Sequence, residues 1–223
     1  MDPAPREQRI AAPHASYARI LRETRVQCRS LAVSGIKLFE PAIVKDARGS
    51  FSETFLERAL IDFGIHAHFV QENHSVSVPA GVVRGLHFQI PPNTQDKLVR
   101  VIRGAVLDVA VDIRAGSPTF SRHVAIELSA ENRLQLWIPK GFAHGFCTLE
   151  PNTEVLYKAT AYYDPTAERG VRWNDPDLLI QWPISAAEAR LSPRDRHLPC
   201  LAQLDPCFQF KAGRHRRALE PHR

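Results

Sequence analysis

The feature that most constrains the fold is a two-residue alternation of apolar side chains through the middle of the chain. In the segment "GAVLDVAVDI" every second residue shares one face of an extended strand: Ala105, Leu107, Val109, Val111 and Ile113. The alternation recurs at 124–128 and 134–138, on either side of a "SAEN" turn, and "EVLYKATAYYD" follows as a further strand. Short strands separated by Gly and Pro turns predict an all-β, antiparallel sandwich or jelly roll.

The chain of 223 residues suits one large β domain, which we expect to span residues 31–207. Residues 1–30 show no sustained apolar period and are predicted to be a poorly ordered extension. Residues 208–223 read as a basic tail. Two peripheral segments have helical spacing: "FLERALIDFG", with a stop at Gly64, and residues 185–197.

The net charge of +5 does not indicate nucleic-acid binding, because of where the charge lies. Residues 1–30 carry six arginines and three acids, and residues 208–223 carry five basic residues and one acid. Subtracting both tails from the 29 basic and 24 acidic residues leaves 18 basic and 20 acidic residues in the body. A nucleic-acid reader is expected to gather positive charge on a folded face. We therefore expect no nucleic-acid partner.

The composition also indicates the cellular compartment in which the protein is expected. The four cysteines, at positions 28, 147, 200 and 207, form no CxxC pair, so free thiols are expected. No apolar run approaches the roughly 18 residues of a membrane span, and the N-terminus lacks the apolar core of a secretory signal. The arginines there could mimic an organellar presequence, but a loose extension fits better. We expect a cytoplasmic protein with no membrane partner.

The segment "GVVRGLHFQIPPNTQDKLVRVIRG" holds the first candidate for chemistry, His87. A metal-binding β-barrel of the cupin type usually has an H-x-H pair, but Phe88 and Gln89 follow His87. The later His144, in "PKGFAHGF", also has no neighbouring histidine. Catalytic zinc usually keeps three protein ligands, so two isolated imidazoles are too few. We expect no metal; an ordinary structural role for His87 remains open at this point.

Two tyrosines mark a possible pocket wall. Tyr157 and Tyr163 fall on one face of their strand, with only Ala159 and Ala161 between them, which leaves room for a ligand. The alternative is that both phenols lie at a rim with their hydroxyls in water. Neither reading follows from the tyrosines alone.

The combination of residue types is more informative than any one of them. A histidine base, a lysine cation and a tyrosine acid can remove a proton next to a carbonyl, hold the enolate oxygen and return a proton. His87, Lys97 and Tyr157 supply these three groups. An aspartate behind the imidazole would fix its tautomer, and Asp195 in "LSPRDRHLP" is a candidate.

Two arginines could bind phosphate. Arg48 lies in the "DARG" turn and Arg84 precedes "GLH", and a guanidinium can bind a phosphate with two hydrogen bonds. Both could equally be solvated turn residues. The chain has neither a P-loop nor a GxGxxG fingerprint, so side chains would have to hold any phosphate.

Taken together, the motifs resemble the dTDP-4-dehydrorhamnose 3,5-epimerase family of cupin-like nucleotide-sugar epimerases. The resemblance lies in "DARGSFSETF", "FVQENHSVS", "VVRGLHFQIPPNTQDKLVRVIRGAVLDVAVDIRAGSPTF", "LSAENRLQLWIPKGFAHGF", "VLYKATAYYDPTAERGVRWNDPDLLIQWP" and "LSPRDRHLP". These segments follow the family's order over roughly residues 36 to 199.

The resemblance implies a role for each matching residue. The base would be His87, its partner Asp195, the general acid Tyr157, and the lysine near the substrate ketone Lys97. The implied nucleotide-sugar contacts are Arg48, Glu53, Gln71, Asn73, Arg84, His144, Tyr163 and Glu168. The resemblance further implies a jelly-roll homodimer in which an N-terminal segment crosses to its partner, and neither metal nor organic cofactor.

The expected activity is conversion of dTDP-4-dehydro-6-deoxy-D-glucose to dTDP-4-dehydro-L-rhamnose by inversion at C3 and C5. Inversion at one carbon only, or on a related nucleotide sugar, is an alternative within the same class. A non-catalytic module that binds sugar nucleotides is the alternative from another class, and a metal-dependent oxygenase is a more distant one. Two departures from the family pattern bear on the choice of sugar: Arg194 in place of a lysine, and a loop between Asn73 and Arg84 that is one residue longer.

Overall fold

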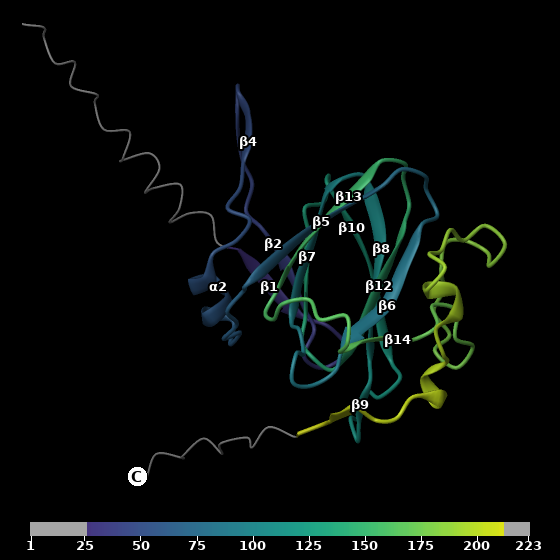
Figure 1. Cartoon of the computed structure of the whole chain (residues 1–223). Coiled ribbons are helices and arrows are strands. Elements are labelled where there is room, and N and C mark those ends of the chain that lie inside the picture. The colour runs from purple at the N-terminus through teal and green to yellow at the C-terminus, as the bar shows by residue number, and fades with distance from the viewer. Residues whose placement is uncertain (1–25, 212–223) are drawn as a thin grey trace, which may run out of the picture.

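The computed structural model describes residues 26–211, which form two antiparallel sheets packed face to face (Figure 1). The first sheet has six strands in the order β1 (Gln27–Ser30), β2 (Lys37–Glu40), β11 (Gln135–Ile138), β7 (Lys97–Arg103), β13 (Thr153–Ala159) and β5 (Gln71–Ser77). The second has five, in the order β10 (His123–Ser129), β8 (Ala105–Asp112), β12 (Phe142–Thr148), β6 (Val83–Gln89) and β14 (Glu168–Gly170). The predicted all-β fold is confirmed.

The remaining elements are short. They are the hairpin of β3 (Val44–Asp46) and β4 (Gly49–Phe51), the helix α2 (Glu57–Asp62), the 3-10 helices η1 (Asp195–His197) and η2 (Leu201–Gln203), and the parallel pair β9 (Arg114–Ala115) and β15 (Phe208–Gln209). No helix within residues 26–211 is long and apolar enough to cross a membrane.

The main core lies between the two sheets. Val99 and Val155 face inward from the six-stranded sheet and meet Val106 and Phe146 from the five-stranded one, all nearly inaccessible to solvent. This interface fixes the two sheets relative to each other. Side chains at the same level on opposite sheets can therefore face one cavity.

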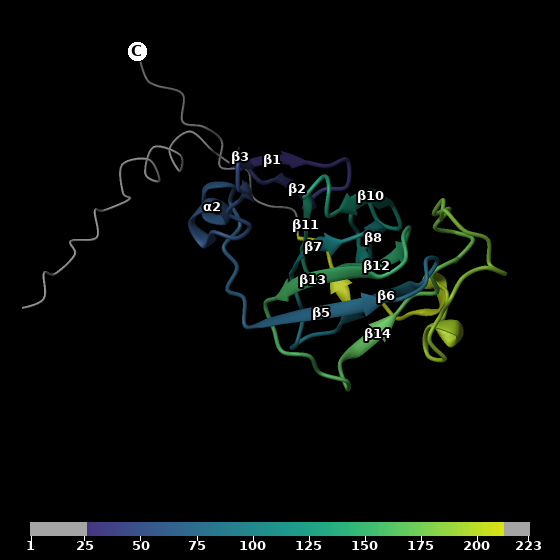
Figure 2. The same ribbon diagram turned by 90° about the horizontal axis from the view of Figure 1, so that it is seen from above.

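The five-stranded sheet is buried on both faces. Val109 and Val111 of β8, which lie on the predicted apolar face, point away from the main core and pack with Leu178 of the C-terminal segment. Both views place this segment and α2 on opposite sides of the sandwich (Figure 1, Figure 2). The second burial explains why β8 is apolar on both faces, apart from Asp108 and Asp112.

The helix α2 covers part of the outer face of the six-stranded sheet. Leu60 of the helix packs in a cluster with Phe39 and Trp137 of the sheet. The helix ends before Gly64, whose φ of +77° suits a residue without a side chain. The expected helix and its stop are therefore present.

The structure differs from the sequence-based expectation at three places. The expected extension already contains β1, which begins at Gln27, and the expected basic tail contains β15, where Phe208 packs edge-to-face on Phe88. Residues 185–197 form only η1 rather than a longer helix. The reason is that the backbone of Arg190 pairs with Gly81 and Val83, as a strand residue would.

Candidate active site

A cavity of about 510 Å³ opens between the two sheets at the end covered by the C-terminal segment. Its walls come from three sources. The five-stranded sheet contributes His87 and His144, the six-stranded sheet contributes Lys97 and Tyr157, and the C-terminal segment contributes Asp195. The structure thus brings the four predicted catalytic residues together, although 108 positions separate the first from the last.

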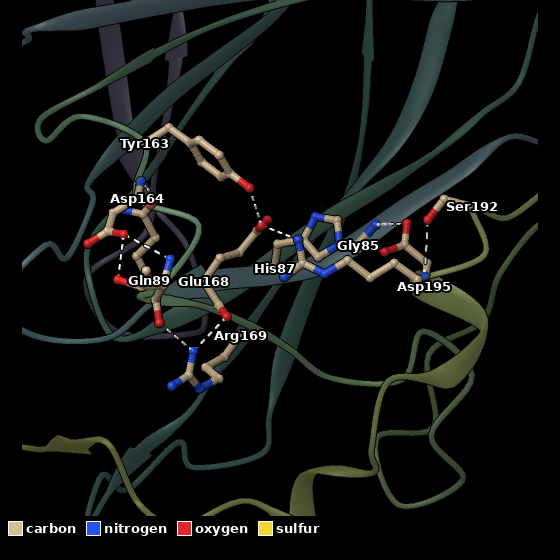
Figure 3. A network of polar contacts seen from close by, with 11 residues as sticks. Gly85, His87, Gln89, Tyr163, Asp164, Glu168, Arg169, Ser192 and Asp195 are labelled. Atoms are coloured by element: carbon tan, nitrogen blue, oxygen red, sulfur yellow. Dashed lines mark hydrogen bonds and ion pairs between the residues drawn. The ribbon is translucent and has the colours of Figure 1, made fainter.

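His87 and Asp195 form a short hydrogen bond. The Nε2–H group of His87 donates to Oδ1 of Asp195 at 2.6 Å. Asp195 is nearly buried, and its Oδ2 accepts the Gly85 N–H at 3.4 Å (Figure 3). Burial disfavours the carboxylate, but the hydrogen bond and charge of His87, together with hydrogen bonds from Gly85 and Ser192, outweigh burial, so the pKa of Asp195 lies below its ordinary value. An ionised Asp195 holds Nε2 protonated, which leaves Nδ1 with the lone pair.

The glycine of the "RGLH" motif allows β6 and β12 to come very close. A Cβ on Gly85 would lie 2.6 Å from the carbonyl oxygen of His144, and one on Gly145 would lie 2.6 Å from that of Arg84. Neither position tolerates a side chain. As a result His87 and His144 are direct register partners on neighbouring strands.

His144 has its own carboxylate. Its Nε2 lies 3.0 Å from both oxygens of Asp108, which is fully buried on β8. Sequence reasoning did not single out Asp108; the signal available was an acid interrupting the apolar run "VLDVAV". The cavity therefore has two imidazoles side by side, each backed by an aspartate.

Lys97 and Tyr157 face the imidazoles from the opposite sheet. The Lys97 Nζ lies 5.7 Å from the centroid of the Tyr157 ring, within cation–π range. Burial lowers the pKa of Lys97 to about 8, and the negative charges of Glu168 and Asp108 limit the fall. Burial and the Glu168 charge raise the pKa of Tyr157, which keeps the phenol protonated. The six-stranded sheet thus supplies a cation and a proton donor.

Glu168 organises the rim of the cavity. Its Oε2 accepts the Tyr163 hydroxyl at 2.7 Å and forms an ion pair with Arg194. Burial raises the pKa of Glu168, but these two hydrogen bonds and the nearby His87 lower it more, so the group is ionised. In Figure 3 the Glu168–Tyr163 pair lies on one side of His87 and Asp195 on the other.

Gln71, Asn73 and Arg84 form a polar group beside the cavity. Gln71 donates to Asn73 at 2.9 Å and accepts the Tyr163 N–H at 2.8 Å, which ties β5 to the rim. Arg84 lines the cavity itself and donates to the Ser77 hydroxyl at 3.2 Å. Gln71 and Asn73 share the inward face of β5 with the cavity-lining Ser75 but do not line the cavity themselves.

The family of this chain follows from its match to a known family model. A family model described as dTDP-4-dehydrorhamnose 3,5-epimerase matches residues 30–203. The chain belongs to this family. The resemblance read from the sequence motifs is confirmed.

Individual relatives agree with this membership. The dTDP-4-dehydrorhamnose 3,5-epimerase of Sinorhizobium fredii is 47% identical over 182 residues, which cover 82% of this chain and 93% of the relative. The crystal structure of a dTDP-6-deoxy-D-glucose-3,5-epimerase from Legionella pneumophila in complex with dTDP-4-keto-L-rhamnose has a TM-score of 0.80 and 43% identity, covering 84% of this chain and 100% of that one. A 3'-monoepimerase from Streptomyces bikiniensis, in complex with dTDP-quinovose, has a TM-score of 0.73 and 36% identity, covering 78% and 87%.

Among the residues matched to the epimerase family, Arg48 and Glu53 lie away from the cavity and its rim. Arg48 lies in the β3–β4 hairpin, which projects away from the sandwich (Figure 1). Its side chain is 91% exposed and pairs with Asp46 of the same hairpin. Glu53 lines a separate small recess beside Phe55 and Leu60. In a single chain, neither residue is among those that line the cavity.

Within residues 26–211, no three His, Cys, Asp or Glu side chains gather as a metal site would require. The two cavity histidines each face a single aspartate instead. The expectation of a metal-free and cofactor-free reaction stays a prediction.

We predict that Lys97 titrates with a midpoint near pH 8, whereas an unperturbed lysine titrates at about 10.4. The Lys97 side chain is therefore charged below this midpoint and loses its charge as the pH rises through it. Carbon-13 NMR of labelled lysine Cε, assigned with Lys97→Met, measures the midpoint. Glu168→Gln should lower it further, because the Glu168 charge favours the ammonium. A Lys97 midpoint above 10 would show that the ammonium is fully solvated.

Proposed function

We propose that this chain converts dTDP-4-dehydro-6-deoxy-D-glucose to dTDP-4-dehydro-L-rhamnose by inverting C3 and C5. The observation that carries the proposal is the placement of a base and an acid on opposite walls of one cavity. His87 comes from the five-stranded sheet and Tyr157 from the six-stranded sheet. Inversion requires that the proton leave one face of the sugar and return to the other.

The reaction begins with the C4 ketone, which acidifies the hydrogens on C3 and C5. His87 removes one of them through Nδ1, since Asp195 holds Nε2–H. Asp195 also stabilises the imidazolium that forms, as a carboxylate behind a catalytic histidine does. A positioned base of this kind contributes roughly 10²–10⁴ in rate.

The resulting enolate needs a cation and a proton donor. The Lys97 ammonium stabilises the charge on the C4 oxygen, a contribution of roughly 10²–10³ in rate for a preorganised donor. Tyr157 returns a proton from the opposite face for at least one carbon. Before the second carbon reacts, His87 loses its proton to water and Tyr157 regains one from water. Repeating the sequence at the second carbon then completes the double inversion, with His87 and Lys97 in the same roles.

The polar residues around this centre are proposed to hold the nucleotide sugar. Arg84 binds the diphosphate, and His144 binds the sugar from the wall that carries His87. Further contacts come from Gln71, Asn73, Tyr163 and Glu168. The cytoplasmic location remains a prediction.

The observations favour one alternative and oppose another. The structural likeness to a 3'-monoepimerase shows that single-centre inversion occurs on this fold. A non-catalytic binding module would keep the cavity, but it has no use for the His87–Asp195 pair or for a lysine with a pKa of about 8. The His87–Asp195 pair favours an enzyme, and the number of carbons inverted is a matter for experiment.

We predict opposite isotope behaviour for two variants in D₂O. His87→Asn cannot accept a proton, so deuterium exchange and inversion should both collapse. Tyr157→Phe leaves abstraction intact, so exchange should persist while inversion falls by about 10²–10⁴. Proton NMR of the sugar follows both processes in each folded variant.

The matched control is His123→Asn, because His123 lies on β10 at the edge of the five-stranded sheet and does not line the cavity. This variant should behave as the wild type. Persistent exchange in His87→Asn would remove His87 as the base. Equal loss of exchange and inversion in Tyr157→Phe would assign the phenol to abstraction instead.

We further propose that the chain acts as a homodimer, in which Arg48 and Glu53 serve the partner's cavity. The hairpin that carries Arg48 projects away from its own sandwich. The outer face of the six-stranded sheet exposes Val76 at 50% and Ile102 at 38%, apolar area that a partner would cover.

Sedimentation should therefore give about twice the chain mass of 25.1 kDa. Arg48→Gln should keep that mass and raise the KM for the nucleotide sugar, since the guanidinium binds phosphate rather than holding the dimer. A fully active monomer would contradict both the dimer and the contribution of Arg48 in trans.

A further inference from the structure

A third arginine faces the cavity in addition to Arg84 and Arg194. Arg190 belongs to the C-terminal segment, and its backbone forms a parallel bridge with Val82. Its N–H donates to Gly81 at 2.9 Å, and its carbonyl accepts the Val83 N–H at 3.0 Å. These bonds fix the Arg190 backbone next to the start of β6. Arg84 is the residue of β6 that directly follows Val83. Arg190 is one of the residues that line the same cavity.

The charges of the cavity are not balanced at this end. Arg194 is neutralised by Glu168, and Asp195 is paired with His87. Arg84 donates only to neutral groups, the Ser77 hydroxyl and the Val76 carbonyl. Among residues 26–211, no acidic side chain lies within ion-pair distance of Arg190. Two guanidiniums without a carboxylate therefore face one cavity.

An unpaired hydroxyl lies in the same wall. The Ser75 Oγ is buried and has no hydrogen-bond partner among the described residues. Ser75 lines the cavity and shares the inward face of β5 with Ser77, which holds Arg84. Buried polar groups are nearly always paired, so an unpaired hydroxyl on a cavity-lining residue points to a ligand atom. This observation is independent of the arginine charges.

Two free guanidiniums and a hydroxyl match an oxyanion with several charged oxygens. We propose that Arg190 is a substrate-contacting residue, which binds the diphosphate of the nucleotide sugar together with Arg84 and the Ser75 hydroxyl. The inference rests on the proposed function, because that function supplies the diphosphate. It adds Arg190 and Ser75 to the residues matched by the sequence motifs, and it gives the C-terminal segment a direct part in binding in addition to its support of His87.

The test compares Arg190→Gln with Arg196→Gln. Arg196 is an exposed arginine of η1 that does not line the cavity, so both variants lose the same charge in the same segment. Calorimetry measures the binding of thymidine, dTMP and dTDP to each folded variant. Arg190→Gln should weaken dTDP binding about ten-fold, or about 1.4 kcal/mol. It should weaken dTMP binding less and leave thymidine binding unchanged, whereas Arg196→Gln should change none of them.

Two further variants sharpen the result. Arg190→Lys keeps the charge but loses the two-pronged donor, so it should restore part of the dTDP affinity. Ser75→Ala should weaken dTDP binding while the melting temperature of the free protein stays equal or rises, because the variant removes an unpaired hydroxyl. A purely structural role for Ser75 would lower the melting temperature and leave dTDP affinity unchanged.

The outcomes separate this inference from the proposed function. Equal dTDP affinity in Arg190→Gln and Arg196→Gln would overturn the inference, even if the wild type is an active epimerase. Equal loss of thymidine and dTDP affinity in Arg190→Gln would also overturn it, because the contact would then not involve phosphate. Arg190-dependent dTDP binding in a wild type that turns over no substrate would uphold the inference and refute the epimerase activity.

Discussion

The hydrogen bond between His87 and Asp195 ties the C-terminal segment to the centre of the five-stranded sheet. To bring Asp195 to His87, the chain has to cross the outer face of that sheet after β14. Val171 exchanges backbone hydrogen bonds with Leu86, and Leu198 packs so closely on Gly170 that a Cβ there would lie 2.7 Å away. The C-terminal segment covers the apolar outer face of β8 along this path. As a result, the Asp195 carboxylate is nearly buried and yet remains ionised.

The opposed sheets provide the rest of the site. Each wall has a fixed chemical character, because strand register decides which side chains face inward. The five-stranded wall presents two imidazoles with aspartates behind them, and the six-stranded wall presents Lys97 and Tyr157. The sandwich core holds these walls at a constant separation. In the proposed reaction, a sugar bound between them would meet a base on one face and a proton donor on the other.

Much of this arrangement could be predicted from the sequence, because a two-residue period determines strands and shared faces directly. The placement of His87, Lys97, Tyr157 and Asp195 in one site came from the family motifs rather than from periodicity. The acid that interrupts "VLDVAV" makes Asp108 unusual, but pairing between distant strands leaves no local signal for its contact with His144 or for the position of Ser75 in the cavity wall. Residues 185–197 have helical spacing, yet the bonds of Arg190 to β6 override it. Long-range backbone pairing of this kind cannot be read from composition or period.

The account depends on the removal of a proton from one face of the sugar and the return of a different proton to the other face, at two carbons. The most direct measurement is proton NMR of the wild-type reaction in D₂O, with the hydrogens on C3 and C5 followed separately as the sugar inverts. The account predicts that solvent deuterium replaces the hydrogen at both carbons and that each labelled carbon in the product is inverted. Inversion at either carbon with retention of the original hydrogen would contradict it, because the hydrogen removed from one face and the proton returned to the other would then be the same atom.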